Sequence, residues 1–249
     1  MNDPVKAVLK RIRLYGTNLY RPRLLDFARQ AATIATQADP VVMALAPEAP
    51  GRLAGLREEF GALLTAIEGR QGPNATLASV PMALDREQAF LLYALARLRR
   101  PRAIVETGVA KGVSTFFLLN ALRENQGGSL TSFDIDPGAG ALLRPDERAS
   151  WRFVVLDRDS ARRQFSGGLA SLPHLDLFVH DSDHSYGYQS FEYHAALPRM
   201  EPGSLLASDD VDGSFAFLDF CAARGYRSHY LVSPAKVFGV AEVADRPSG

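Results

Sequence analysis

The stretch from Ala103 to Ser114 constrains the fold of this chain more than any other. It reads Ala-Ile-Val-Glu-Thr-Gly-Val-Ala-Lys-Gly-Val-Ser, an apolar run that ends in Glu106 and is followed by two glycines. An apolar pattern with helical spacing begins directly afterwards, at Thr115. A strand, a glycine turn and a helix in this order are typical of the first unit of a nucleotide-binding α/β sheet. Gly108 would let the backbone turn sharply and approach a ligand, since glycine carries no Cβ atom.

The chain after Pro101 alternates between short apolar runs and helical patterns. The apolar runs lie at 103–106, 129–134, 152–156, 175–180 and 203–208, and the helical patterns at 114–123, 138–145, 159–170, 187–197 and 213–223. Two further runs, 226–232 and 236–243, are joined by Ser233-Pro234-Ala235 and predict a closing hairpin. This alternation predicts parallel strands with helical crossovers. We expect a Rossmann-like α/β domain over 101–249, with a seven-stranded, mostly parallel sheet and an antiparallel last strand.

Residues 1–100 are expected to form an N-terminal helical segment that acts as a lid or as an oligomerisation element. Apolar positions recur at helical spacing in 5–12, 24–36, 53–67 and 88–98, and Asp85 is a candidate N-cap for the last of these. The basic amphipathic stretch 5–12 could lie on a membrane surface, but we expect it to pack on the domain or on a second subunit. A homo-oligomer is therefore expected.

Charge and cysteine content argue against several classes of protein. Lysine plus arginine and aspartate plus glutamate both number 28, and zero net charge argues against broad electrostatic binding to nucleic acid. The one cysteine, Cys221, rules out an intrachain disulfide and a multi-cysteine zinc site, and it fits a reducing compartment. No run approaches the ~18 apolar residues of a membrane span, and the N-terminus has no apolar region typical of a signal peptide. We expect a cytoplasmic protein.

Polar and acidic residues follow the expected parallel strands, at the edge where open sheets bind their ligands. Asp134 ends the second strand, where a carboxylate can accept both ribose hydroxyls of a nucleoside. The ends of the later strands carry Asp157, Asp159, Ser160, Asp181, Asp183, His184, Asp209, Asp210 and Asp212. Asp159 and Asp212 could instead cap helices, and Asp136-Pro137 could form a turn. So many carboxylates at one edge nevertheless favour a ligand site over capping alone.

Residues 106–114, Glu-Thr-Gly-Val-Ala-Lys-Gly-Val-Ser, resemble the first motif of class I S-adenosylmethionine-dependent methyltransferases. Their E-x-G-x-x-x-G-x-S form is closest to the cation-dependent O-methyltransferases of the catechol and caffeoyl-CoA type. The segment Asp-Ser-Asp-His-Ser-Tyr at 181–186 and the Pro-Gly-Ser at 202–204 with Asp209-Asp210 also resemble bacterial enzymes that methylate macrolide sugars. The resemblance covers about 103–245 and does not extend to residues 1–100.

The resemblance implies where S-adenosylmethionine binds. Four residues of the first motif would surround its methionine end and its ribose: Glu106, Gly108, Gly112 and Ser114. Asp134 would hold the ribose hydroxyls, and Asp159 and Ser160 would lie beside the adenine. Asp181 would also contact the cofactor.

The resemblance also implies a metal site. Asp181, Asp209 and Asp210 match the metal ligands of that family, in which the last pair is usually Asp-Asn. Oxygen ligands without cysteine suit a hard cation such as Mg²⁺, which would lower the pKa of a coordinated hydroxyl. His184 falls where the catechol-type enzymes carry a catalytic lysine, so His184 and Asp181 are the candidate catalytic residues. His184 could equally orient a metal-bound carboxylate or cap the next helix, whereas His180 is expected to pack in the core.

These observations favour an S-adenosylmethionine-dependent O-methyltransferase that requires Mg²⁺ or another divalent cation. The expected substrate is a hydroxylated small molecule such as a sugar, a catechol or a polyketide-type natural product. A nicotinamide-dependent oxidoreductase is the second hypothesis, although Ala110 stands where its G-x-G-x-x-G motif would place a glycine. The third hypothesis is a non-catalytic domain of the same fold that binds a partner through residues 1–100.

Overall fold

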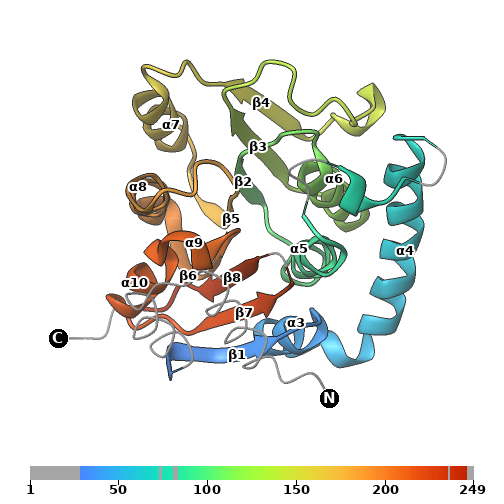
Figure 1. The fold of residues 1–249 in the computed structure, drawn as a ribbon, viewed down its shortest axis with the longest axis horizontal. Helices are drawn as coiled ribbons and strands as arrows, with labels where there is room; N and C mark the ends of the chain where they lie inside the picture. The colour runs from blue at the N-terminus through green and yellow to red at the C-terminus, as the bar shows by residue number, and fades with distance from the viewer. Residues whose placement is uncertain (1–28, 73–74, 81–83, 235, 246–249) are drawn as a thin grey trace.

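The computed structural model describes residues 29–72, 75–80, 84–234 and 236–245, which form an eight-stranded sheet with helices on both faces (Figure 1). The strand order is β1-β7-β8-β6-β5-β2-β3-β4. Strand β8 is antiparallel to both of its neighbours, and every other pair in the sheet is parallel. The strands are β1 (Ala31–Ala35), β2 (Ala103–Thr107), β3 (Ser129–Asp134), β4 (Trp151–Val155), β5 (Leu175–His180), β6 (Met200–Ser208), β7 (Ser228–Val232) and β8 (Val237–Glu242).

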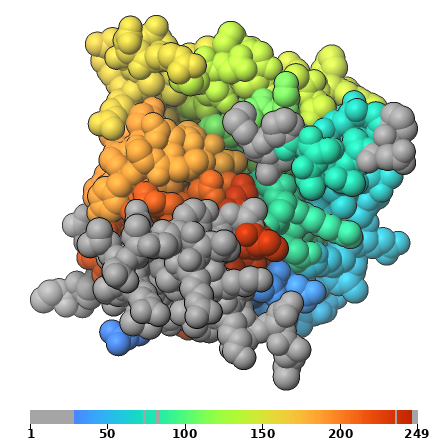
Figure 2. Space-filling model, viewed as in Figure 1, coloured from blue at the N-terminus to red at the C-terminus, as the bar shows by residue number. Residues whose placement is uncertain are grey.

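The helices divide between the two faces of the sheet. One face carries α3 (Asp39–Leu45), α4 (Leu53–Gly69), α5 (Arg86–Arg99) and α6 (Val113–Asn125), and the other carries α7 (Ala161–Ala170), α8 (Tyr186–Ala196), α9 (Val211–Ser214) and α10 (Ala216–Ala222) (Figure 1). Each face buries its own hydrophobic cluster, and neighbouring strand residues such as Ile104 and Val105 point into opposite clusters. Strand alternation thus explains why the strands are apolar throughout. Figure 2 shows the resulting surface, with the β3–β4 end in green and yellow and the β1 end in blue.

Two elements differ from the sequence-based expectation. The predicted helix 24–36 is wrong at Ala31–Ala35, which forms an eighth strand paired in parallel with β7; residues 24–28 lie outside the described residues, as does the stretch 5–12. Pairing with a distant strand determines whether such a short apolar segment forms a helix or a strand, and local propensity does not contain this information. The predicted helix 138–145 is also wrong: it is a turn followed by a short 3₁₀ helix, Pro145–Glu147. Gly140 explains this, since its φ of +77° interrupts a helix.

The remaining predicted strands and the antiparallel last strand are confirmed, and helices α4 to α8 match the patterns predicted at 53–67, 88–98, 114–123, 159–170 and 187–197. The predicted helix 213–223 is divided into α9 and α10 at Phe215, which has a φ of +62°. Asp85 caps α5, because its side chain accepts a hydrogen bond of 2.9 Å from the backbone N–H of Gln88. Helix α5 is buried almost along its whole length between the sheet, α4 and α6. The described residues between 29 and 100 therefore pack on the same sheet as the rest of the described chain.

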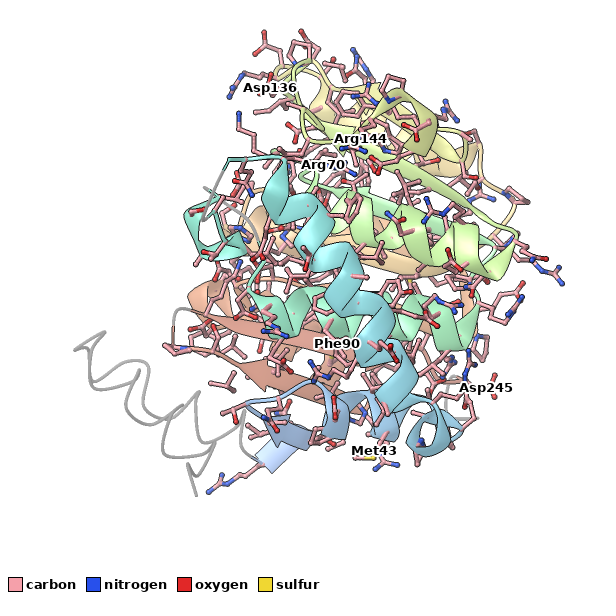
Figure 3. The ribbon with its side chains drawn as sticks, turned by 90° about the vertical axis from the view of Figure 1, so that its right-hand side faces the viewer. Met43, Arg70, Phe90, Asp136, Arg144 and Asp245 are labelled. Atoms are coloured by element: carbon pink, nitrogen blue, oxygen red, sulfur yellow. The ribbon has the colours of Figure 1, made fainter. Side chains whose placement is uncertain are left out.

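Helix α4 crosses the outside of this face, with Arg70 directly after its C-terminal end (Figure 3). The Arg70 guanidinium pairs with Glu147 at 2.5 Å and donates a hydrogen bond of 2.7 Å to the carbonyl oxygen of Leu142. These contacts tie α4 to the loop that follows β3. None of the helices in the described part of the chain has the length and apolar character needed to cross a membrane.

The order of the strands reverses at β2. From β2 the chain adds β3 and β4 on one side, and it then returns to add β5 and β6 on the other side. Backbone hydrogen bonds continue past the strand ends here: Gly108 donates to Phe133, Asp181 to Thr107 and Asp209 to His180, each at 2.9 Å. The carboxyl ends of β2, β3, β5 and β6 are thereby held side by side. Open α/β sheets bind ligands at such a switch point.

Candidate active site

The glycine turn after β2 admits no side chain at two positions. Gly108 has a φ of +78°, and a Cβ atom there would lie 1.9 Å from the carbonyl oxygen of Asp181. Gly112 has a φ of +90° at the start of α6, and its Cβ would lie 3.0 Å from the Cα of Gly140. Both residues are therefore required by backbone conformation and by close approach. The turn brings the end of β2 into contact with the end of β5.

Glu106 lies beneath this turn and is completely buried. Its carboxylate accepts hydrogen bonds from the hydroxyls of Ser114 at 2.5 Å, Thr115 at 2.8 Å and Ser132 at 2.7 Å. Burial raises the pKa of Glu106 although these hydrogen bonds favour the carboxylate. Glu106 and Ser114 thus join β2, β3 and α6 from within, and neither is among the residues that line the pocket.

Asp134, at the end of β3, faces the other side of the turn and lines the pocket. One carboxylate oxygen accepts hydrogen bonds from the backbone N–H groups of Val109 at 2.7 Å and Ala110 at 3.1 Å. The other oxygen accepts one from Asp136 N–H at 2.9 Å. Asp134 is therefore held rigidly at the position where the sequence predicts a ribose-binding carboxylate.

The residues after β4 are arranged by Asp157. Its Oδ1 accepts hydrogen bonds from the backbone N–H groups of Asp159 and Ser160 and from the Ser160 hydroxyl, each at 3.1 Å. Arg158 and Ala161 line the pocket, whereas Asp159 and Ser160 are not among its lining residues. The adenine contact expected of Asp159 and Ser160 remains a prediction.

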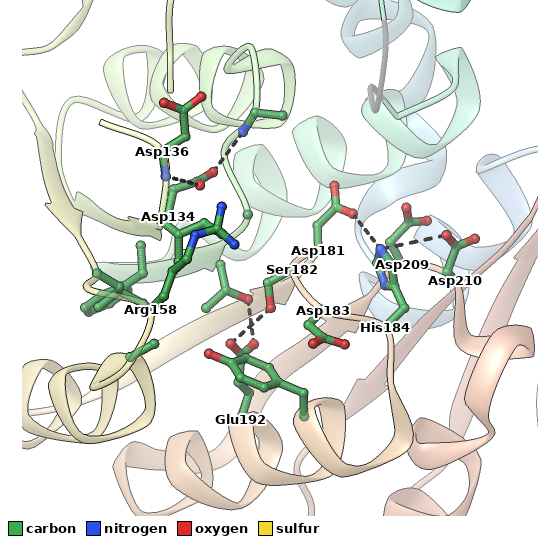
Figure 4. A pocket seen from close by; sticks show the side chains of 18 of the residues that line it. Asp134, Asp136, Arg158, Asp181, Ser182, Asp183, His184, Glu192, Asp209 and Asp210 are labelled. Atoms are coloured by element: carbon green, nitrogen blue, oxygen red, sulfur yellow. Dashed lines mark hydrogen bonds and ion pairs between the residues drawn. The ribbon is translucent and has the colours of Figure 1, made fainter. Parts of the chain in front are cut away.

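A pocket of about 780 Å³ lies over these strand ends (Figure 4). Its volume is within the range of small-molecule sites. One side is formed by the glycine turn, Asp134 and Arg158, and we call it the turn side. The opposite side, the acidic side, is formed by Asp181, His184, Asp209, Asp210 and Lys236. The pocket joins two of the predicted cofactor residues, Gly108 and Asp134, to the predicted metal residues.

The carboxylates of the acidic side come from two neighbouring strand ends. Asp181 follows β5, and Asp209 and Asp210 follow β6. Burial, and then repulsion by Asp209, raises the pKa of Asp181 well above its usual range. Asp209 is 1% exposed, and its Oδ1 atom has no hydrogen-bond partner among the described residues. A buried carboxylate oxygen without a donor is a candidate ligand atom.

His184 lies between the two strand ends (Figure 4). Its Nε2 atom is 3.8 Å from Asp181 Oδ1 and 3.8 Å from Asp210 Oδ2. Burial lowers the pKa of the imidazole although the Asp210 carboxylate opposes this shift. His184 thus presents one ring nitrogen to the carboxylates at the position that the sequence indicates for a proton acceptor.

Lys236 was missed as a site residue in the sequence, where it is simply the first residue of the expected last strand. Its ammonium group pairs with Asp209 Oδ2 across the acidic side. Burial would lower the pKa of Lys236, but Asp209 and Asp181 outweigh it and raise that pKa. No local motif predicts this contact, because it depends on the antiparallel pairing of β8 with β6.

A buried polar network supports the acidic side from below. Glu192 accepts hydrogen bonds from the hydroxyls of Thr107 at 2.7 Å and Ser182 at 3.0 Å, and its carboxylate lies 2.6 Å from His180 Nδ1. His180 is completely buried, as expected from its place in β5. The network fixes Ser182 and the backbone on both sides of Asp181.

The acidic side offers donors that suit a divalent cation. Asp181, His184 and Asp209 each present one ligand atom, and these atoms lie within 4.8 Å of one another. Carboxylate oxygens with one imidazole fit Mg²⁺ or Mn²⁺ better than a soft metal. The unpartnered Asp209 Oδ1 supports this fit, although the Lys236 ammonium already provides a positive charge at the same carboxylate.

Comparison with known proteins shows what the central part of the chain resembles. Residues 105–211 match a family model described as a methyltransferase domain. A search of curated proteins gives no match to this chain. Residues 105–211 are therefore similar to a methyltransferase domain, and the predicted resemblance to class I S-adenosylmethionine-dependent methyltransferases is confirmed.

Solved structures share the fold at low sequence identity. An O-methyltransferase of Bacillus cereus in complex with S-adenosylhomocysteine has a TM-score of 0.54 and 15% identity, covering 74% of this chain and 90% of its own. The O-methyltransferase TomG of Streptomyces achromogenes, involved in tomaymycin synthesis and solved with S-adenosylmethionine, has a TM-score of 0.54 and 20% identity over 74% and 89%. A Podospora anserina methyltransferase with S-adenosylhomocysteine bound has a TM-score of 0.55 and 16% identity over 74% and 88%. The Rossmann-like methyltransferase fold is thus confirmed.

Proposed function

We propose that this protein transfers a methyl group from S-adenosylmethionine to a hydroxyl oxygen of a small molecule, with a divalent cation at the acidic side. The observation that carries the proposal is that one pocket joins the glycine turn to the acidic side. A methyltransferase needs this arrangement, because the methyl donor and the acceptor must meet within one cavity. Two solved O-methyltransferases of the same fold, from Bacillus cereus and Streptomyces achromogenes, hold S-adenosylhomocysteine and S-adenosylmethionine.

The turn side would bind the cofactor. Gly108 lines the pocket at the turn, and Asp134 places a carboxylate where two ribose hydroxyls can donate to it. Glu106 acts from beneath, because its three hydroxyl partners hold β2, β3 and α6 in register. The cofactor would supply an activated methyl group on a sulfonium, so a neutral acceptor oxygen must lose a proton during transfer.

The acidic side would bind the acceptor. Asp181, Asp209 and Asp210, with His184, would hold the cation, which when bound lowers the pKa of a substrate hydroxyl. His184 Nε2 faces the carboxylates, so His184 would take the hydroxyl proton or orient Asp181 and Asp210. Adjacent hydroxyls on a sugar, a catechol or a polyketide would fit a site of this kind, because hard cations prefer oxygen ligands.

A methyl-transfer assay on a panel of hydroxylated acceptors tests this function. We expect transfer that falls to background in excess chelator and returns with Mg²⁺ or Mn²⁺, and His184→Ala should reduce kcat more than it weakens S-adenosylhomocysteine binding. Full turnover in chelator would contradict the metal requirement and leave His184 as the base of a metal-free reaction. Transfer to nitrogen or carbon acceptors, with none to hydroxyls, would contradict the proposed acceptor class.

A further inference from the structure

Lys236 combines two properties that a passive surface lysine lacks. Its side chain is only 16% exposed, and its ammonium contacts a carboxylate that is 1% exposed. Arg158, on the turn side, is the other lysine or arginine that lines the pocket within the described residues. Lys236 therefore provides the positively charged side chain of the acidic side.

Formal charge shows why a cation is needed there. Asp181, Asp209 and Asp210 place three carboxylates, formally three negative charges, at neighbouring positions. Burial, and then repulsion by Asp209, raises the pKa of Asp181. Lys236 reduces the total to two negative charges. Without Lys236 or a metal ion, the buried Asp209 carboxylate would have no counter-ion, which is costly in a protein interior.

Lys236 and a metal ion would meet at Asp209. Lys236 uses Oδ2, whereas Oδ1 is buried and unpartnered on the same carboxylate. An ion within reach of Asp181, His184 and Asp209 would therefore lie a few ångströms from the ammonium group. Like charges at such a distance repel strongly where water is scarce.

We propose that Lys236 is a built-in cation that competes with the divalent metal for Asp209, so that it weakens metal binding and stabilises the acidic side when no metal is bound. This inference rests on the proposed metal site of the methyltransferase. The ammonium neutralises Asp209 in the metal-free protein, and metal entry requires it to move away or to remain against an opposing charge. Lys236 is thus a positioning residue that lowers the affinity of the site for metal, so that a higher metal concentration is required to fill it.

Calorimetric titration of the full chain with Mn²⁺ tests this inference. We expect Lys236→Met to bind Mn²⁺ at least tenfold more tightly than the unchanged protein, about 1.4 kcal/mol. Lys236→Arg keeps the charge and should stay within threefold. Arg123→Met is the matched control, since the Arg123 side chain in α6 is 62% exposed and its replacement removes the same charge away from the acidic side. Unchanged or weaker Mn²⁺ binding by Lys236→Met, or no binding by either protein, would overturn the proposal.

Two further variants locate the effect. Lys236→Gln retains a hydrogen-bond donor for Asp209, so it provides the same comparison if Lys236→Met fails to fold, as judged by thermal unfolding. Asp181→Asn added to Lys236→Met should cancel the gain in affinity, and a gain that survives it would show that Mn²⁺ binds elsewhere. Titration with S-adenosylhomocysteine separates the two proposals: failure to bind it contradicts the methyltransferase function, whereas normal binding with no gain in Mn²⁺ affinity contradicts only the role of Lys236.

Discussion

The turn side and the acidic side of the pocket are built in opposite ways. On the turn side, Asp134 accepts three hydrogen bonds from the protein, and so does Glu106, which is buried behind the turn. On the acidic side, Asp209 Oδ1 and His184 Nδ1 are buried without partners among the described residues, and neighbouring carboxylates repel one another. The carboxylates of the turn side thus have all their partners within the protein. Those of the acidic side are partnered by Lys236 and, we propose, by a bound ligand.

This difference indicates that one side of the pocket maintains a fixed geometry and the other binds a ligand. A satisfied network fixes geometry, because each partner restricts the others. An unsatisfied cluster of charges is costly to the fold and persists where it binds something. Changes on the turn side should therefore lower stability and cofactor affinity together, whereas neutralising a carboxylate on the acidic side should impair function and spare the fold.

Gly108→Ala should give the largest effect. The added Cβ would clash with the carbonyl oxygen of Asp181, and the alanine would have to adopt an unfavourable positive φ. We expect the free energy of unfolding to fall by about 3 kcal/mol, and S-adenosylhomocysteine affinity to fall at least a hundredfold. Gly187→Ala in α8 is the control, because its Cβ would meet nothing within 4 Å, and urea unfolding with calorimetry compares the two. Equal stability of both variants would break the account of the turn.

Glu106→Gln tests the buried network. An amide would set an NH₂ group against hydroxyls that now donate, so we expect a loss of about 2 kcal/mol in the free energy of unfolding. Glu58→Gln, on the exposed side of α4, should change it by less than about 0.5 kcal/mol. Chemical denaturation measures both, and a Glu106→Gln protein of unchanged stability would mean that this carboxylate does not hold the turn.

Asp134→Ala should weaken S-adenosylhomocysteine binding at least about tenfold, ~1.4 kcal/mol. The variant loses the proposed ribose acceptor and also frees the backbone N–H groups of Val109 and Ala110. Asp146→Ala removes an exposed carboxylate in the 3₁₀ helix after β3 and serves as the control for charge. Unchanged affinity, by calorimetric titration, would remove Asp134 from the cofactor site.

Asp181→Asn should give the smallest effect and the opposite sign. It removes a carboxylate that Asp209 repels, so in chelator we expect the free energy of unfolding to rise by about 1 kcal/mol. Methyl transfer should nevertheless be lost. Thermal unfolding and the transfer assay measure the two outcomes, and a destabilised Asp181→Asn would make the acidic side a structural network like the turn side.

The sequence predicted the backbone of the turn side and the position of Asp134, since local signals specify them. Gly108 and Gly112 mark backbone conformations that few other residues adopt, and Asp134 directly follows an apolar strand. The fourth predicted strand end likewise placed Asp181 at the pocket, and the third placed Asp157 next to the lining residue Arg158. Chain-local patterns sufficed because parallel strands bring their carboxyl ends together.

The errors arose where distant residues decide the structure. Ala31–Ala35 becomes a strand because β7 offers it an edge, about 200 residues further along the chain. Lys236 reaches Asp209 because β8 pairs antiparallel with β6, and neither residue carries a local signal for the other. Glu106 was expected to contact the cofactor, yet its partners Ser114, Thr115 and Ser132 surround it in the interior.

Calorimetric titration of the full chain with S-adenosylhomocysteine, in buffer containing Mg²⁺, tests the central claim most directly. The account predicts binding with a micromolar Kd to the unchanged protein, and weaker binding to Asp134→Ala under the same conditions. Absence of binding by a protein that unfolds cooperatively would contradict the assignment of this pocket to a methyl donor.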